Sequence, residues 1–143
     1  MNNMWLVYAL LSAVCASLVA IFGKVGLQSI DANTATAIRS VVMAVFLVIV
    51  VATQGSLSKI PEIISNKKAI SSIFLSGIAG ALSWLFYFLA LKFGTVPKVA
   101  PIDKLSVVIA AILAAAFLGE KMSMMNCTGI GLIAIGAIIV ALS

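Results

Sequence analysis

Long apolar runs separated by short polar stretches dominate this chain. A helix needs about 20 mainly apolar residues to cross the ~30 Å hydrocarbon layer of a bilayer, and each of these runs approaches that length. The strict alternation typical of barrel strands is absent from the sequence, so a helical bundle is the expected spanning structure. We therefore predict an all-α, polytopic membrane protein, a single domain over residues 1–143. Its five transmembrane helices are expected at approximately residues 4–23, 33–53, 69–91, 99–118 and 124–142.

Polar residues between the runs suggest where these helices begin and end. Asn33 or Thr34 is expected to cap the second helix, because short polar side chains favour the N-cap position. The stretch from Gln54 to Lys68 is the most polar part of the chain and is expected to be a loop in water. Gly119 is a natural stop for the fourth helix, since glycine is common just beyond a helix end.

Composition agrees with this assignment. Hydrophobic residues make up 64% of the chain, charged residues 9%, and the mean hydropathy is +1.27. This leaves too little polar surface to cover a soluble globule of 143 residues, so the lipid bilayer is the expected partner. The net charge of +5 comes from basic residues scattered along the chain. Because they form no single patch, nucleic acid is not expected as a partner.

An acid and a base stand side by side within the fourth apolar run. Asp103 and Lys104 follow two residues after Pro101, about one turn inside the run. A charged side chain at the bilayer centre costs on the order of 3 kcal/mol even on lenient insertion scales, so such groups suggest function. Alternatively, the pair lies in the headgroup layer, where the lysine snorkels and marks the membrane boundary.

Arg39 lies within the first two turns of the second helix and also permits two interpretations. It snorkels to the interface, or it faces a cavity and meets an anionic group or Asp103 across the bundle.

Aromatic residues gather in the second half of the third helix. Gly77, Gly80, Trp84, Tyr87 and Leu91 share one face at helical spacing, so the glycines open space at one end that aromatics fill at the other. Aromatics near a helix end are most often an interfacial belt. A tryptophan and a tyrosine beside a glycine-lined hollow also suit the wall of a substrate pocket.

Several kinds of chemistry are excluded by what the sequence lacks. It has no histidine, and Cys15 and Cys127 each lie inside an apolar run, so neither a Cys/His metal cluster nor a Cys/His nucleophile can form. It also has no phosphate-binding P-loop. We expect no catalytic residues, no metal and no cofactor, and therefore no enzyme. Movement of a molecule across the bilayer is the remaining class of function.

The distribution of basic residues gives little preference for either orientation. An odd helix count puts Lys59, Lys67, Lys68 and Lys121 on one side of the membrane. The other side receives Lys24, Arg39, Lys92, Lys98 and Lys104. Because the positive-inside rule reads such differences, this balanced chain is expected to insert both ways.

Two sequence blocks resemble a known family. Residues 100–106, Ala-Pro-Ile-Asp-Lys-Leu-Ser, are followed after an alanine-rich span by residues 117–121, Phe-Leu-Gly-Glu-Lys. Together with Phe22-Gly23-Lys24 and the approach to Arg39, this arrangement resembles an EamA-type domain of the drug/metabolite transporter superfamily over essentially the whole chain.

The resemblance implies half of an inverted-repeat transporter, since larger members are similar to two five-helix repeats of opposite orientation around a central cavity. It implies an antiparallel homodimer in a prokaryotic inner membrane, a secondary carrier that moves small metabolites or drugs by alternating access. Asp103 is the candidate for proton or cation coupling. The resemblance implies that the cavity is lined by Ser12, Trp84, Tyr87, Asp103, Lys104 and Ser106, and Arg39 joins them as a candidate for substrate binding or coupling.

Two other functions fit the same sequence. A non-transporting membrane subunit would need these side chains only for assembly. A flippase-like carrier would move a lipid-linked headgroup in place of a water-soluble metabolite. An aromatic wall with one acid and two bases nearby does not distinguish amino acids, purines, organic cations or sugars.

Overall fold

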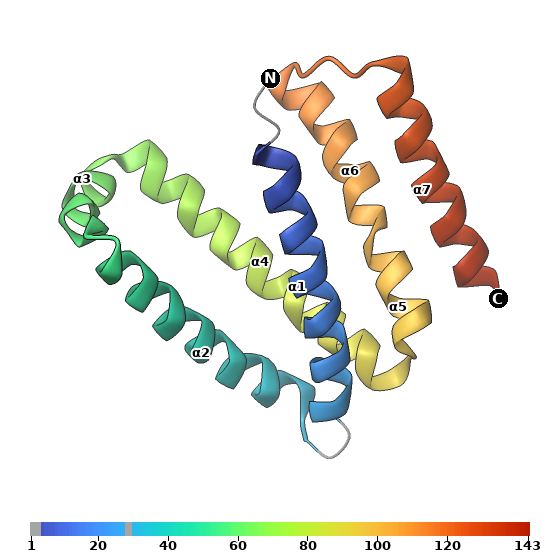
Figure 1. Ribbon diagram of the computed structural model, residues 1–143, viewed down its shortest axis with the longest axis horizontal. Coiled ribbons are helices and arrows are strands. Elements are labelled where there is room, and N and C mark those ends of the chain that lie inside the picture. Colours follow the sequence, from blue (N-terminus) through green and yellow to red (C-terminus); the bar gives the residue numbers. More distant parts are fainter. Residues whose placement is uncertain (1–3, 28–29) are drawn as a thin grey trace. The chain divides into compact units, whose positions relative to one another are not determined.

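The described part of the chain is built from helices, and five of its segments could span a membrane (Figure 1). The structure is a computed structural model that describes residues 4–27 and 30–143. No strand occurs among these residues. The predicted all-α, polytopic architecture is therefore confirmed. The spanning segments are Met4–Gly26 (α1), Ala32–Thr53 (α2), Lys67–Phe93 (α4), Val96–Leu118 and Met124–Leu142 (α7).

The start of α2 corrects one expectation. The cap is Asp31, not Asn33 or Thr34: its Oδ2 accepts hydrogen bonds from the Thr34 backbone N–H at 2.8 Å and from the Thr34 hydroxyl at 3.0 Å. An aspartate at the N-cap reaches the amide three residues later, which otherwise has no partner within the helix. Thr34 thus contributes as the donor in this arrangement.

The polar stretch after α2 is mostly helical, contrary to the expected loop. It holds the 3₁₀ turn η1 (Ser56–Lys59) and the short helix α3 (Ile60–Ser65). Gly55 has φ +67°, a conformation that glycine adopts without steric cost, and it turns the chain out of α2. Pro61 stands in the first turn of α3, where its missing N–H is not needed.

The fourth spanning segment is not a continuous α-helix. It consists of α5 (Val96–Asp103), α6 (Leu105–Leu113) and a π-turn, η2 (Ala114–Leu118). Pro101 lies inside α5 and has no N–H to donate, and the Lys104 amide bonds the Pro101 carbonyl at 3.1 Å in a tighter turn. The segment ends at Gly119 with φ +67°, as its position predicts.

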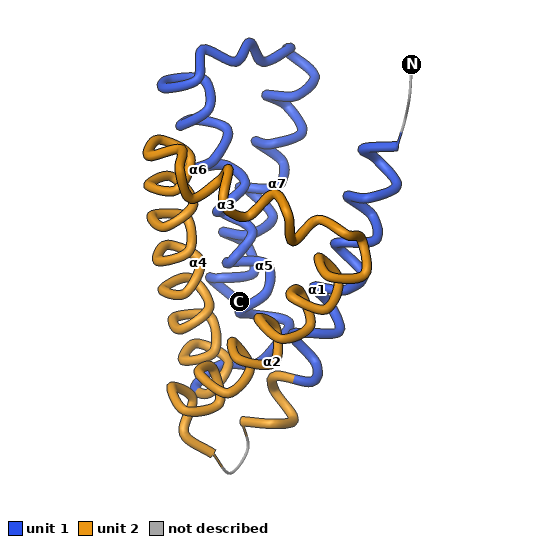
Figure 2. Tube along the Cα trace, turned by 90° about the vertical axis from the view of Figure 1, so that its left-hand side faces the viewer, with its two compact units in different colours: residues 1–22, 93–143 blue, residues 23–92 orange. Residues whose placement is uncertain are grey.

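The chain divides into two compact units, which Figure 2 shows in different colours. One comprises residues 1–22 and 93–143, and within it α5 and α6 pack against α7. The other comprises residues 23–92, which include the end of α1, all of α2, η1 and α3, and nearly all of α4.

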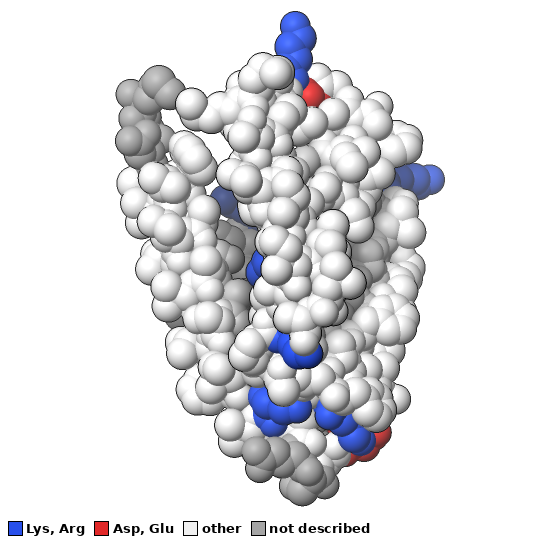
Figure 3. Space-filling view, turned by 90° about the vertical axis from the view of Figure 1, so that its right-hand side faces the viewer, with Lys and Arg blue, Asp and Glu red and all other residues white. Residues whose placement is uncertain are grey.

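Large apolar side chains are exposed along the spanning helices. Trp5, Phe46 and Phe117 are 69%, 64% and 81% exposed, respectively. Uncharged side chains make up most of the face shown in Figure 3. Such a surface is stable in hydrocarbon, where apolar side chains need no covering.

Candidate functional site

A cation and three aromatic rings meet within the unit formed by residues 23–92. The Cζ of Arg39, from α2, lies 3.7 Å from the centroid of the Trp84 ring and 4.9 Å from that of Phe88. Trp84 and Phe88 are stacked, with centroids 5.8 Å apart and planes 27° apart. Tyr87 stands edge-on to both rings. We call Arg39, Trp84, Tyr87 and Phe88 the arginine–aromatic cluster.

Helical geometry brings these side chains together. Trp84, Tyr87 and Phe88 stand three and four residues apart on α4, so they project from the same side of that helix. On α2, the Thr36 hydroxyl donates to the Ala32 carbonyl at 2.7 Å and is buried. This hydrogen bond lies in the first turns of α2, about one turn before Arg39.

The arginine has its flat face covered while its donors have no protein partner. A guanidinium carries five N–H donors in its plane. Throughout residues 4–27 and 30–143, no side chain or carbonyl accepts a hydrogen bond from Arg39, which is half-buried. Stacking on an aromatic face stabilises a cation electrostatically but leaves the in-plane N–H groups available. This arrangement can bind a carboxylate or a phosphate at the guanidinium edge.

Sequence reasoning missed one member of this cluster, Phe88, and one contact near it, made by Lys24. Lys24, at the end of α1, donates from its Nζ to the Leu91 carbonyl oxygen at 2.6 Å, near the end of α4. Phe88 is buried and forms part of the stack, and its position four residues after Trp84 was the available signal. The Lys24 contact carried no signal, because it joins residues 67 positions apart in the chain.

Asp103 and Lys104, from the second group of predicted site residues, lie at the break between α5 and α6. Lys104 Nζ and Asp103 Oδ2 form an ion pair at 3.1 Å. The Asp103 side chain is 33% exposed and the Lys104 side chain 55%. Ser106 is exposed two residues further on, and Ser12 is exposed on α1. The Asp103–Lys104 ion pair sits where α5 ends and α6 begins within a spanning segment.

Comparison with known proteins identifies the family. The model of the EamA-like transporter family matches residues 3–142. The chain belongs to this family. It is 45% identical over 141 residues to a Sinorhizobium protein described as an uncharacterized transporter in the cobO 3′ region, and the match covers 99% of each chain. No solved structure is significantly similar to it.

This EamA-like protein is therefore a multi-pass membrane transporter, which lies in the lipid bilayer and moves a small-molecule substrate. Its predicted site residues fall into two sets. Arg39, Trp84 and Tyr87 come together in one unit, while Asp103, Lys104, Ser106 and Ser12 belong to the other. A pairing of Arg39 with Asp103 stays a prediction, because the two residues lie in different units. Within the described chain, no group of three His, Cys, Asp or Glu side chains could hold a metal ion.

Proposed function

We propose that this transporter carries small metabolites that bear a carboxylate or phosphate group, and that Arg39 binds this group. The supporting observation is the guanidinium stacked on Trp84 at 3.7 Å within a spanning helix, with its edge free of protein acceptors in the described residues. Unsatisfied polar groups in the hydrocarbon region cost several kcal/mol each. An anion at the guanidinium edge removes that cost and can make two parallel hydrogen bonds.

The surroundings of the cluster suit a small organic anion. A Cβ added at Gly80, four residues before Trp84 on α4, would meet no atom within 4 Å, so space is open on that side of the helix. Trp84 is only half-buried, which leaves ring surface for an apolar part of the substrate. Mainly apolar walls with a few placed polar groups are typical of ligand sites.

We also propose that the protein is a secondary carrier working by alternating access as an antiparallel homodimer in the inner membrane of a prokaryote. One five-helix chain corresponds to a single repeat of an inverted-repeat transporter, and a second, oppositely oriented copy would supply the other. The near-equal numbers of basic residues on the two sides favour insertion in both orientations. The relative from Sinorhizobium supports the prokaryotic setting.

The substrate proposal is tested by uptake into proteoliposomes containing the full chain. A panel of radiolabelled carboxylates, sulfonates and phosphate esters is compared with neutral and cationic compounds of similar size. At least one anion is expected to be taken up, and Arg39→Gln should lower its initial rate about tenfold or more because the charge-assisted pair is lost. Arg39→Lys should retain part of the rate, since lysine keeps the charge without the planar fork.

Lys59→Gln serves as the control, because it removes one positive charge from η1, outside the cluster. Its uptake rate should equal that of the unmodified protein. Uptake confined to cations, or anion uptake unchanged in Arg39→Gln, would refute the substrate proposal. Transport of a lipid headgroup alone would favour the flippase-like alternative.

Asp103 is proposed to couple transport to protons or another cation. Its carboxylate pairs with Lys104 at the break of the fourth spanning segment, so a change in its charge would disturb a contact at this break. Asp103→Asn should abolish accumulation driven by a pH gradient while leaving exchange of substrate across the membrane intact. Equal gradient-driven accumulation by Asp103→Asn and the unmodified chain would remove Asp103 from this role.

A further inference from the structure

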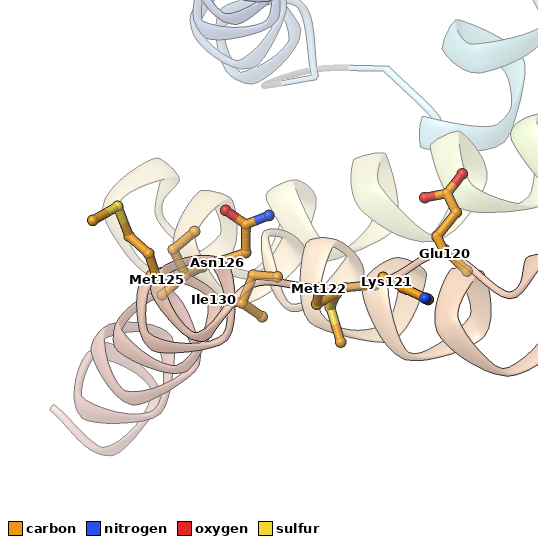
Figure 4. Close-up of a pocket in the computed structure, with 10 residues that line it drawn as sticks. Glu120, Lys121, Met122, Met125, Asn126 and Ile130 are labelled. Carbon is orange, nitrogen blue, oxygen red and sulfur yellow. The ribbon is translucent and has the colours of Figure 1, made fainter.

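A cavity separate from the arginine–aromatic cluster opens beside α6 and α7. Its volume is about 460 Å³, and its lining comes from α6, η2, the connection after Gly119, and the first half of α7 (Figure 4). All of these residues belong to the unit that contains residues 93–143. The cavity is therefore built within one unit of the protein.

The cavity wall has two chemically distinct zones. Ala111, Ala114, Ile130 and Ile133 provide an apolar wall that belongs to the two spanning segments. Glu120, Lys121 and Asn126 provide polar groups around the connection between those segments. Because one segment ends at Leu118 and the next begins at Met124, this connection lies at the level where a bilayer changes from acyl chains to headgroups.

The polar groups are available to a ligand. Glu120 and Lys121 carry opposite charges, are exposed, and form no ion pair or side-chain hydrogen bond within the described ranges. The hydrogen bond of Glu120 is made by its backbone N–H to the Ala114 carbonyl, at 3.3 Å. In Figure 4 the Glu120 carboxylate and the Asn126 carboxamide point toward the same side of the cavity. An anionic group, a cationic group and an amide thus all line this cavity.

We propose that this cavity binds a glycerophospholipid whose headgroup carries a primary ammonium, as phosphatidylethanolamine does. The ammonium donates hydrogen bonds to Glu120, while the phosphate accepts them from Lys121 and the Asn126 amide. An acyl chain lies along the apolar wall of alanine and isoleucine. A free headgroup would leave that wall uncovered, so the observations favour the whole lipid.

The cavity offers a matched pair of variants for the test. Gly129 lines the cavity, and a Cβ added there would meet no atom within 4 Å, so Gly129→Leu fills the cavity without a clash at Cβ. A Cβ at Gly131 also meets open space, but Gly131 lies two residues along α7, on the other side of the helix, and does not line the cavity. Gly131→Leu therefore adds the same side chain outside the site.

Binding is measured by native mass spectrometry of the delipidated full chain, titrated with phosphatidylethanolamine, phosphatidylcholine or glycerophosphoethanolamine. We expect phosphatidylethanolamine to bind about tenfold more tightly than phosphatidylcholine, whose trimethylammonium has no N–H to donate. Glu120→Gln should remove this preference. Gly129→Leu should weaken binding of both lipids about tenfold, and Gly131→Leu should not.

Results of three kinds would overturn the proposal. The first is equal binding of the two lipids by the unmodified protein. The second is an unchanged preference in Glu120→Gln, or unchanged binding in Gly129→Leu. The third is binding of glycerophosphoethanolamine as tightly as the intact lipid, which would mean that the acyl chain contributes nothing. Each measurement is independent of transport, so the result stands whether or not Arg39 binds the substrate.

Discussion

Arg39 combines a covered face with an open edge, and this combination decides how it can act. The flat face of its guanidinium lies against Trp84 and Phe88, and its in-plane N–H groups point away from both rings. Such a contact contributes about 0.5 to 2 kcal/mol, which offsets part of the cost of placing a cation within a spanning helix. The sequence predicted Arg39 and Trp84 as candidate site residues. It could not show that they touch, because they lie on different helices, α2 and α4, and helical spacing relates only residues of one helix.

Asp31 gives the fold a dependence on pH. Its carboxylate accepts hydrogen bonds first from the Thr34 backbone N–H and then from the Thr34 hydroxyl, and these lower the pKa of Asp31 below its ordinary value. A lowered pKa in the folded state means that the stabilisation is present above the unfolded pKa of about 3.9 and is lost as the pH falls through the folded pKa.

Two replacements of Asp31 distinguish the contribution of its N-cap hydrogen bond from that of its negative charge. Asp31→Asn should keep the cap at neutral pH and lose this part of the pH dependence, whereas Asp31→Ala should lower the melting temperature at neutral pH as well. Thermal unfolding in detergent, followed by circular dichroism from neutral to acidic pH, measures both effects. If the melting temperatures of Asp31→Asn and the unmodified chain fall equally as the pH is lowered, the carboxylate does not contribute in this way.

At the scale of elements, the end of α1 approaches α4 at a glycine. A Cβ added at Gly23 would overlap the Phe88 ring, coming within 3.1 Å of its Cζ in addition to a shorter contact with Cε1. Because Phe88 is buried and stacked on Trp84, the ring has little freedom to move aside. Gly23 thus allows the last residues of α1 to lie close to the Phe88 ring of α4.

Gly23→Ala is expected to destabilise the protein by about 1 to 3 kcal/mol through overpacking, and to displace Phe88 from the stack. Gly26→Ala is the matched control, because the same methyl group on the same helix would meet no atom within 4 Å. Chemical unfolding in mixed micelles measures the free energy difference, and tryptophan fluorescence in a Trp5→Phe background reports the change near Trp84. Equal stability of the two variants would mean that the helices separate without cost.

The elements themselves were largely predictable because the membrane imposes one rule. A run of apolar residues long enough to cross hydrocarbon must be helical, and the five predicted helices follow from this rule alone. The rule does not describe what happens inside a run or outside the membrane. The break at Lys104 and the π-turn at Ala114–Leu118 depend on local hydrogen bonding. The helical character of Ile60–Ser65 depends on Pro61 at its start, a signal that overall polarity concealed.

The candidate site was predictable in its residue types and not in its grouping. Side-chain chemistry singled out Arg39, Trp84 and Tyr87 together with Asp103 and Lys104. Only the contacts of α2 with α4 show that the first three form a cluster, and only the geometry at the α5 end shows that the last two pair with each other.

At the scale of the whole molecule, balanced charge is the feature that bears on assembly. If transport needs both membrane orientations, added lysines that fix one variant in each orientation should create two variants that work only together. Ser56→Lys with Ser58→Lys adds charge to η1, and Ile30→Lys with Asn33→Lys adds it at the opposite end of α2. By the positive-inside rule the two double variants should insert in opposite orientations.

Each double variant alone should lose most uptake, and co-expression of the two should restore it. C-terminal reporters that are active on only one side of the membrane establish the orientation of each variant, and uptake in cells establishes function. Full activity of either variant alone would argue against the antiparallel homodimer. In that case a single orientation would suffice for transport.

The arginine–aromatic cluster is complete within residues 23–92 of one chain. A homodimer would consequently carry the cluster in duplicate, whereas a transporter fused from two unlike repeats is free to keep it in one half and lose it from the other. The number of substrate molecules bound per dimer is therefore informative. A calorimetric titration that ends at two equivalents per dimer would mean that the copies act separately, and one that ends at a single equivalent would mean that the first molecule bound closes the second position.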